Sequence, residues 1–129
     1  MASVRKKILI VEDEPEILKA YVKAFAAAGF EVLQSSQGMD GIVQAVEGHP
    51  DLIILDLMLP QVDGFELLQA LKNNSELTIP VVVLSNSNDP KSIERALALG
   101  AKAFLLKLDY PPPKLVEKIR AFLAHPVIP

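Results

Sequence analysis

Five short apolar runs alternate with five stretches of helical periodicity along this chain, and that alternation limits the fold more than any other feature. The apolar runs lie at 8–11, 30–33, 52–55, 80–84 and 102–106. The run before Asp56 is apolar at consecutive positions, as expected of a strand covered on both faces. Strict alternation favours a parallel sheet with right-handed crossovers and helices on both sides. The sequence therefore predicts an α/β domain built on a doubly wound, five-stranded parallel sheet.

Turn-forming and capping residues separate the predicted elements. Pro15 opens the first predicted helix, and Asp13 or Glu14 is available as its cap. Gly29 is predicted to end that helix in the left-handed conformation. In the helix predicted over 41–47, the residues expected to face the core are Ile42, Val43 and Val46.

The length and composition indicate a cytoplasmic domain. A chain of 129 residues suits one domain, which we place at 1–125, followed by a tail or the start of a linker at 126–129. It contains no cysteine, which excludes disulfides, thiolate zinc sites and cysteine nucleophiles. A net charge of −3 argues against nonspecific nucleic-acid binding. We expect no membrane association, because no apolar run approaches the roughly 20 residues of a membrane span and no signal-peptide pattern follows Met1.

Polar side chains follow four of the five predicted strands. They are Glu12 and Asp13 after the first, Asp56 after the third, Ser85 after the fourth and Lys107 after the fifth. Because the carboxyl ends of parallel strands meet at one edge, where ligands bind, we expect these side chains to lie together. Three neighbouring carboxylates need a countercharge, and an all-oxygen ligand set suits Mg²⁺.

Lys107 and Ser85 complete the requirements for phosphoryl transfer to Asp56. Such a site needs a carboxylate nucleophile, a metal ion, a fixed positive charge and a hydroxyl donor. Taken singly, Glu12 and Asp13 are better explained as helix caps, Asp56 equally well as a turn residue, and Ser85 and Lys107 better as solvated loop residues. Their convergence at one sheet edge favours a functional site.

At these residues the chain resembles the receiver domains of two-component response regulators, over essentially its whole length. The family has an acidic pair after the first strand, a phosphoacceptor Asp after the third, Ser or Thr after the fourth and Lys after the fifth. The matching segments are Val11-Glu12-Asp13-Glu14, Leu55-Asp56-Leu57-Met58-Leu59-Pro60, Val62-Asp63-Gly64, Leu84-Ser85-Asn86 and Leu106-Lys107. The resemblance implies the flavodoxin-like (CheY-like) three-layer sandwich with strand order 2-1-3-4-5.

The resemblance also implies a mechanism. A sensor histidine kinase or a histidine phosphotransfer protein would donate a phosphoryl group to Asp56. Mg²⁺, with Mn²⁺ as an alternative, would be bound by Asp13, Asp56 and the backbone carbonyl of Met58. Glu12 would act on the metal directly or through water, and Lys107 would pair with a phosphoryl oxygen. Beyond this phosphotransfer and its own dephosphorylation, no enzyme activity is expected.

Two further residues would transmit the change. Ser85 would move to hydrogen-bond the phosphoryl group, and Phe104 would rotate inward. These movements would remodel the surface made by the helix after Pro90, the strand 102–106 and the last helix, which a downstream protein or output domain reads. An aromatic residue at the position of Phe104 is equally well explained by packing. The family includes monomers and weak homodimers.

Three positions depart from the usual family pattern. Ser85 stands in place of the commoner Thr and retains its hydroxyl, so we expect the switch to be kept. Asn86 replaces a small Ala and is expected to restrict access to the phosphoryl group and alter its lifetime. Leu108 replaces a Pro that usually follows a cis peptide bond. Because a cis bond before a residue other than proline costs about 3 kcal/mol, we predict a trans bond between Lys107 and Leu108.

Three other functions compete with this interpretation. A phosphatase of the haloacid-dehalogenase type also uses an Asp nucleophile, but requires a second Asp where Met58 stands. A flavodoxin-like cofactor binder needs a phosphate-binding loop after the first strand, where the acidic segment 12–15 would repel phosphate. A pseudo-receiver that acts only as a protein-binding scaffold is disfavoured by the intact acidic residues and lysine.

Overall fold

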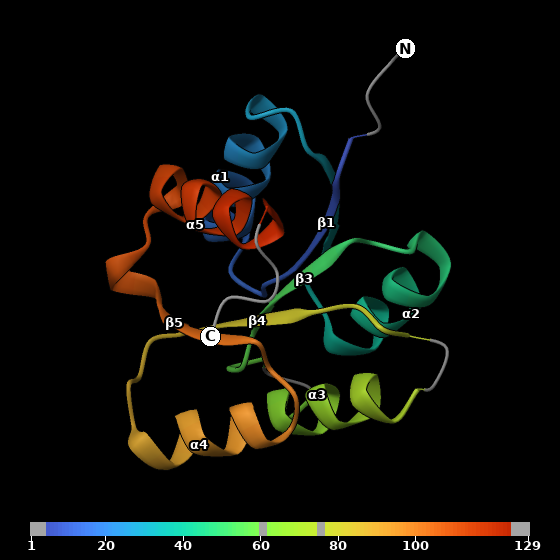
Figure 1. Cartoon of the computed structure of the whole chain (residues 1–129), viewed down its shortest axis with the longest axis vertical. Helices are drawn as coiled ribbons and strands as arrows, with labels where there is room; N and C mark the ends of the chain where they lie inside the picture. The colour runs from blue at the N-terminus through green and yellow to red at the C-terminus, as the bar shows by residue number, and fades with distance from the viewer. Residues whose placement is uncertain (1–4, 60–61, 75–76, 125–129) are drawn as a thin grey trace.

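The five predicted strands pair in parallel in the order β2-β1-β3-β4-β5 (Figure 1). The computed structural model describes residues 5–59, 62–74 and 77–124. Its strands are β1 Lys7–Val11, β2 Glu31–Ser35, β3 Leu52–Asp56, β4 Val81–Ser85 and β5 Ala103–Leu106. The central strands β1, β3 and β4 are almost entirely buried. The predicted doubly wound sheet and its strand order are therefore confirmed.

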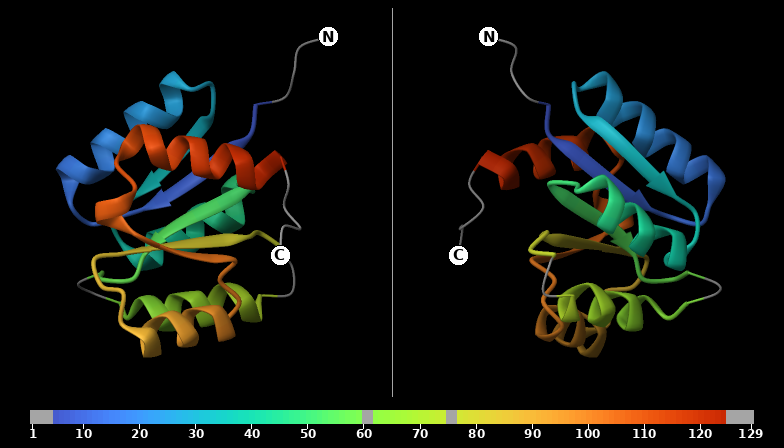
Figure 2. Two further views of the ribbon diagram at one scale, coloured as in Figure 1. Left: turned by 60° about the vertical axis from the view of Figure 1, so that its left-hand side comes forward. Right: turned by 90° about the vertical axis from the view of Figure 1, so that its right-hand side faces the viewer.

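Helices cover both faces of this sheet. They are α1 Pro15–Ala27, α2 Gly38–Gly48, α3 Gly64–Asn73, α4 Pro90–Ala98 and α5 Pro112–Ala124. The first and last, α1 and α5, pack on one face, whereas α2, α3 and α4 pack on the other (Figure 2). A short 3-10 turn, η1 Lys107–Asp109, joins β5 to α5. The result is the predicted three-layer sandwich.

Strand β1 shows how each central strand serves both layers. Ile8 and Ile10 belong to the apolar cluster under α1 and α5. Leu9 and Val11 point the other way, into the cluster under α2, α3 and α4. This alternation is the two-residue period of a strand, and it leaves no room for polar side chains on either face. Polar groups are consequently concentrated where the strands end.

The ends of α1 confirm two predictions and correct a third. Pro15 is the first helical residue, and Gly29 has the predicted left-handed backbone, with φ of +97°. Glu14 occupies the cap position, but its side chain makes no capping hydrogen bond. Its backbone N–H instead donates to the carboxylate of Glu12 at 3.3 Å. The predicted side-chain cap was therefore wrong; the other candidate, Asp13, belongs instead to the acidic group with Glu12 and Asp56.

The inward face of α2 was also predicted incorrectly. Val43 and Val46 are 49% and 38% exposed, and of the three predicted residues Ile42 alone packs against the core. The buried residues of α2 are Gly38, Gly41 and Ala45. A side chain at Gly41 would begin only 3.0 Å from Val11, so this helix approaches β1 too closely for larger residues.

Some predicted features lie outside the described residues. These are Pro60, which belongs to the segment after Asp56, and the tail or linker at 126–129. Among the helices that the structure describes, none is long and apolar enough to cross a membrane.

Candidate functional site

Three carboxylates converge at the carboxyl edge of the sheet. Glu12 and Asp13 follow β1, and Asp56 is the last residue of β3. One carboxylate oxygen from each lies within 4.8 Å of the other two. Glu12 and Asp56 are 2% and 3% exposed, whereas Asp13 is half-buried. The predicted proximity is confirmed, and the half-buried member leaves the cluster open toward solvent.

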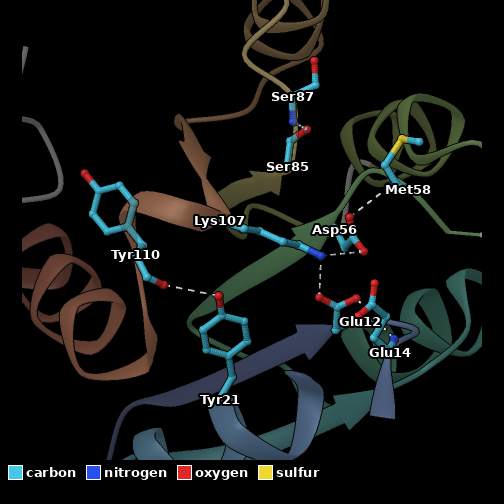
Figure 3. Close-up of polar contacts among 9 residues, drawn as sticks. All are labelled: Glu12, Glu14, Tyr21, Asp56, Met58, Ser85, Ser87, Lys107 and Tyr110. Carbon is cyan, nitrogen blue, oxygen red and sulfur yellow. Dashed lines mark hydrogen bonds and ion pairs between the residues drawn. The ribbon is translucent and has the colours of Figure 1, made fainter. Parts of the chain in front are cut away.

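Lys107 lies against two of these carboxylates (Figure 3). Its Nζ is 2.7 Å from Oε1 of Glu12 and 3.1 Å from Oδ2 of Asp56, and its side chain is buried. These contacts join the ends of β1, β3 and β5 through one ammonium group. With three carboxylates and one lysine, the cluster keeps an excess of negative charge that a divalent cation would offset.

Burial and mutual interaction alter the acidity of this cluster. The pKa of Glu12 is raised to about 7, mainly by burial, with Asp56 adding to the rise and Lys107 opposing it. Burial by itself lowers the pKa of Lys107, but the hydrogen bond to Glu12 and the charge of Asp56 outweigh it and leave the pKa raised. Lys107 therefore remains positively charged, while Glu12 exchanges a proton near neutral pH in the metal-free protein.

The backbone just after β3 fixes the Asp56 carboxylate. The N–H of Met58 donates to its Oδ1 at 3.0 Å, while its Oδ2 contacts Lys107. A bridge between Met58 and Asp63 folds the loop back, and Asp63 caps α3 by accepting from the N–H of Phe65 at 2.9 Å. Met58 thus contacts Asp56 through its backbone amide, and its carbonyl as a metal ligand stays a prediction.

Ser85 lies beside this cluster at the end of β4. In the strand register Asp56 pairs with Leu84, so Ser85 is one position further along the neighbouring strand. The Ser85 side chain is buried, and its oxygen accepts a hydrogen bond from the N–H of Ser87 at 3.1 Å (Figure 3). Because the oxygen is the acceptor there, the hydroxyl proton can still be donated to a group above Asp56.

The donor set fits a magnesium ion. Carboxylate oxygens with an open, half-buried side are the ligands that Mg²⁺ prefers, since this ion usually keeps several waters. The acidic cluster is typical of the Mg²⁺ sites of receiver domains, and residues 8–120 match the family described as response regulator receiver domain. The chain belongs to this receiver family.

Individual relatives agree with that membership. The receiver is 33% identical over 119 residues to the polar-differentiation response regulator DivK of Brucella ovis, covering 92% of this chain and 96% of DivK. It is 29% identical to a probable transcriptional regulator, ycf27, of Porphyridium aerugineum, but spans only 48% of that protein's length.

A solved structure shows the same fold. The phosphorylated cyanobacterial phytochrome response regulator RcpA superimposes with a TM-score of 0.83 and 30% identity, covering 97% of this chain and 98% of RcpA. Membership of the family makes this chain a two-component signalling domain rather than an enzyme that turns over a separate substrate.

The structure bears on two further positions singled out in the sequence. Phe104 is half-buried and packs against the apolar cluster under α2, α3 and α4, in agreement with the packing role that the sequence also allowed. Its rotation remains a prediction. The Lys107–Leu108 peptide bond is trans, as predicted, and Leu108 projects into solvent with 84% exposure.

One residue near the receiver site was missed. No part in the site was predicted for Tyr21, yet its hydroxyl donates to the carbonyl of Tyr110 at 3.3 Å (Figure 3). A buried tyrosine hydroxyl normally has a partner, so the residue type signalled such a contact. The partner could not be identified from sequence, because 89 positions separate the two residues.

Proposed function

We propose that this receiver accepts a phosphoryl group on Asp56 from the phosphohistidine of a sensor histidine kinase or a histidine phosphotransfer protein. The observation that carries the proposal is the convergence of Lys107 and the acidic cluster on the Asp56 carboxylate. A positive charge beside a buried carboxylate, together with metal ligands, is the arrangement that phosphoryl transfer requires. The family membership supports a histidine kinase as partner.

The transfer would exchange one bond to phosphorus for another. A carboxylate oxygen of Asp56 attacks the phosphorus, the bond to the donor imidazole nitrogen breaks, and that nitrogen takes up a proton. Lys107 would turn toward a phosphoryl oxygen, from its present position 3.1 Å from Asp56. Ser85 would donate its hydroxyl proton to another oxygen while it still accepts from Ser87.

Mg²⁺, or Mn²⁺ in its place, would supply positive charge that offsets the carboxylates and the phosphoryl oxygens. Asp13 and Asp56 would hold it with the backbone carbonyl of Met58, and Glu12 would act directly or through a water molecule. The raised pKa of Glu12, which comes mainly from burial, means that a proton must leave this site when the metal binds near neutral pH.

The output would be a change in the surface formed by α4, β5 and α5. Strand β5 is at the edge of the sheet, so movements of Phe104 and Ser85 would reach the exposed side directly. A downstream protein or output domain would distinguish the two forms of that surface. We expect a monomer or weak homodimer that makes no direct contact with nucleic acid, with the receiver spanning 1–125 and a tail or linker at 126–129.

A histidine kinase obtains its phosphoryl group from ATP, and we therefore place the receiver in the cytoplasm with its kinase. The receiver's own dephosphorylation would remove the phosphoryl group from Asp56. We expect Asn86, beside Ser85, to restrict access to that phosphoryl group and so alter its lifetime.

The test is intact mass after incubation with acetyl phosphate and Mg²⁺. We expect one added phosphoryl group on the wild type, none on Asp56→Asn and none without a divalent cation. Asp40→Asn, which changes an exposed carboxylate on α2, is the matched control and should be phosphorylated like the wild type. Addition to Asp56→Asn would show that the acceptor is wrong. A wild type that binds Mg²⁺ but is never phosphorylated, even by kinases, would instead favour a protein-binding scaffold.

A further inference from the structure

The turn that carries Lys107 makes few contacts of its own. Leu108 and Asp109, its other two residues, are exposed. The turn is closed by the N–H of Tyr110, which donates to the carbonyl of Lys107 at 3.2 Å. The next residues, 111–113, are prolines and have no backbone N–H to donate. The first residue of the turn follows directly from Leu106 in β5, which pairs with Ser85, so it is the far end of the turn that depends on what holds Tyr110.

Tyr21 holds Tyr110 from the neighbouring helix. Its hydroxyl donates to the Tyr110 carbonyl at 3.3 Å, and the contact is visible beside the acidic cluster in Figure 3. The Tyr21 side chain is only 4% exposed and is buried in the cluster with Phe25 and Leu115. A side chain packed in this way has little freedom, so the hydroxyl is a fixed point against which the turn is placed.

The other side of Tyr110 faces α5. Nζ of Lys114 lies 5.9 Å from the centroid of the Tyr110 ring. The ring thus leans on α5, whereas the backbone carbonyl is held by α1. Tyr21 also experiences the charges of the site: burial raises the pKa of its hydroxyl, with smaller effects from Lys107, Glu12 and Asp56. The hydroxyl consequently remains a protonated donor.

We propose that Tyr21 is a positioning residue for Lys107, which acts by fixing the Tyr110 end of the turn that begins at the lysine. Loss of the Tyr21 hydroxyl would free the Tyr110 carbonyl, loosen the turn and leave the ammonium group less well placed for a phosphoryl oxygen. This inference rests on the proposed function, because it assigns Tyr21 a part in the transfer to Asp56. No bond to phosphorus involves Tyr21 itself.

The test compares two substitutions that each remove one tyrosine hydroxyl. Tyr21→Phe keeps the buried ring and removes the donor, whereas Tyr110→Phe leaves the accepting carbonyl in place. With acetyl phosphate and Mg²⁺, we expect Tyr21→Phe to be phosphorylated about three- to tenfold more slowly, the factor that corresponds to one lost hydrogen bond. Tyr110→Phe should react like the wild type. Thermal unfolding of each variant shows whether it is folded at the assay temperature.

Two further measurements separate positioning from simple stability. In a Lys107→Met background, Tyr21→Phe should have no additional effect on the residual rate, because the group that it positions is gone. Amide hydrogen exchange at Tyr110 should be faster in Tyr21→Phe than in Tyr110→Phe, since this N–H closes the turn.

Equal rates and equal exchange in the two single variants would overturn the proposal, as would an undiminished effect of Tyr21→Phe without Lys107. A wild type that takes no phosphoryl group would overturn the proposed function instead. The exchange measurement needs no phosphorylation, so it would still decide whether Tyr21 holds the turn.

Discussion

The loop after Asp56 and the turn after Lys107 both place a charged side chain at the same point, but they are held in different ways. After Asp56, the stabilising contacts come from neighbouring residues: the N–H of Met58 binds the carboxylate, and Asp63 caps the next helix. After Lys107, the turn is closed by the hydrogen bond from the N–H of Tyr110 to the carbonyl of Lys107. The carbonyl of Tyr110 is in turn held by the Tyr21 hydroxyl on α1, 89 positions earlier in the sequence.

The difference shows that the two halves of the site depend on different parts of the chain. The half around Asp56 is fixed by contacts between residues two to five positions apart, so it should form when the segment after Asp56 folds against the sheet. The lysine half is correctly placed only when α1, β5 and α5 are packed together. Substitutions at each loop should therefore have separable effects on stability and on phosphorylation.

The largest effect is expected from removing the charge that joins the two halves. Lys107→Met leaves buried Glu12 and Asp56 without their cation, and we expect the free energy of unfolding at pH 8 to fall by about 3 kcal/mol in EDTA. At pH 5 the loss should be smaller, because Glu12, with a pKa of about 7, is already protonated there and Lys107 has one buried negative charge fewer to neutralise. Urea unfolding measures both values. Lys118→Met, at an exposed position on α5, is the control and should change little.

A slightly smaller effect is expected from Gly64→Ala at the end of the loop after Asp56. A methyl group there would meet Cα and the carbonyl oxygen of Leu57, each at 2.5 Å. Backbone atoms cannot move away without shifting the loop, so we expect a loss of about 2 kcal/mol and weaker phosphorylation. Gly48→Ala is the matched control, because the added methyl would meet a flexible Leu33 side chain. Equal losses in the two variants would show that the close approach at Gly64 is unimportant.

The pH dependence of the free energy of unfolding should reveal the interaction between the carboxyl groups of Glu12 and Asp56. Burial raises the pKa of Glu12 from 4.5 to about 7, so this group's contribution to stability is complete below pH 4.5 and is lost as the pH rises through 7. In EDTA we expect a decline of about 2 kcal/mol from this group between pH 4.5 and 7.5. Asp56→Asn should reduce the decline, because the Asp56 carboxylate raises the Glu12 pKa. Urea unfolding across this range tests it, and parallel curves would contradict it.

The smallest effect is expected from Leu108→Ala. Leu108 is 84% exposed, and the turn is held by its ends rather than by this side chain. We expect the free energy of unfolding and the acetyl phosphate rate to change by less than about 0.5 kcal/mol and twofold, respectively. A larger loss of stability would show that the turn has packing of its own. A loss confined to phosphorylation by a kinase would place Leu108 in the docking surface.

The features that sequence predicted correctly are those encoded by neighbouring residues. The apolar run before Asp56, Pro15 at a helix start and Gly29 at a helix end each act locally, and each was confirmed. Because the topology rule then places all parallel strand ends at one edge, the meeting of Glu12, Asp13, Asp56 and Lys107 followed from it.

The failures involve distance between elements rather than local preference. Helical periodicity put Val43 and Val46 inside, but α2 lies so close to β1 that only Gly38, Gly41 and Ala45 fit beneath it. The contact between Tyr21 and Tyr110 likewise depends on how α1 and α5 pack. Residue type gave the need for a partner in that case, but not its identity.

The two contacts of the Lys107 ammonium group bear on the order in which Lys107 would exchange hydrogen-bond partners during phosphoryl transfer. An ammonium group carries three N–H bonds in a tetrahedral arrangement, and Glu12 and Asp56 accept two of them. The third would be available to a phosphoryl oxygen before Lys107 loses its contact with Glu12 or Asp56. Lys107 would then exchange its hydrogen-bond partners one at a time, and its buried ammonium group would have a negatively charged partner throughout.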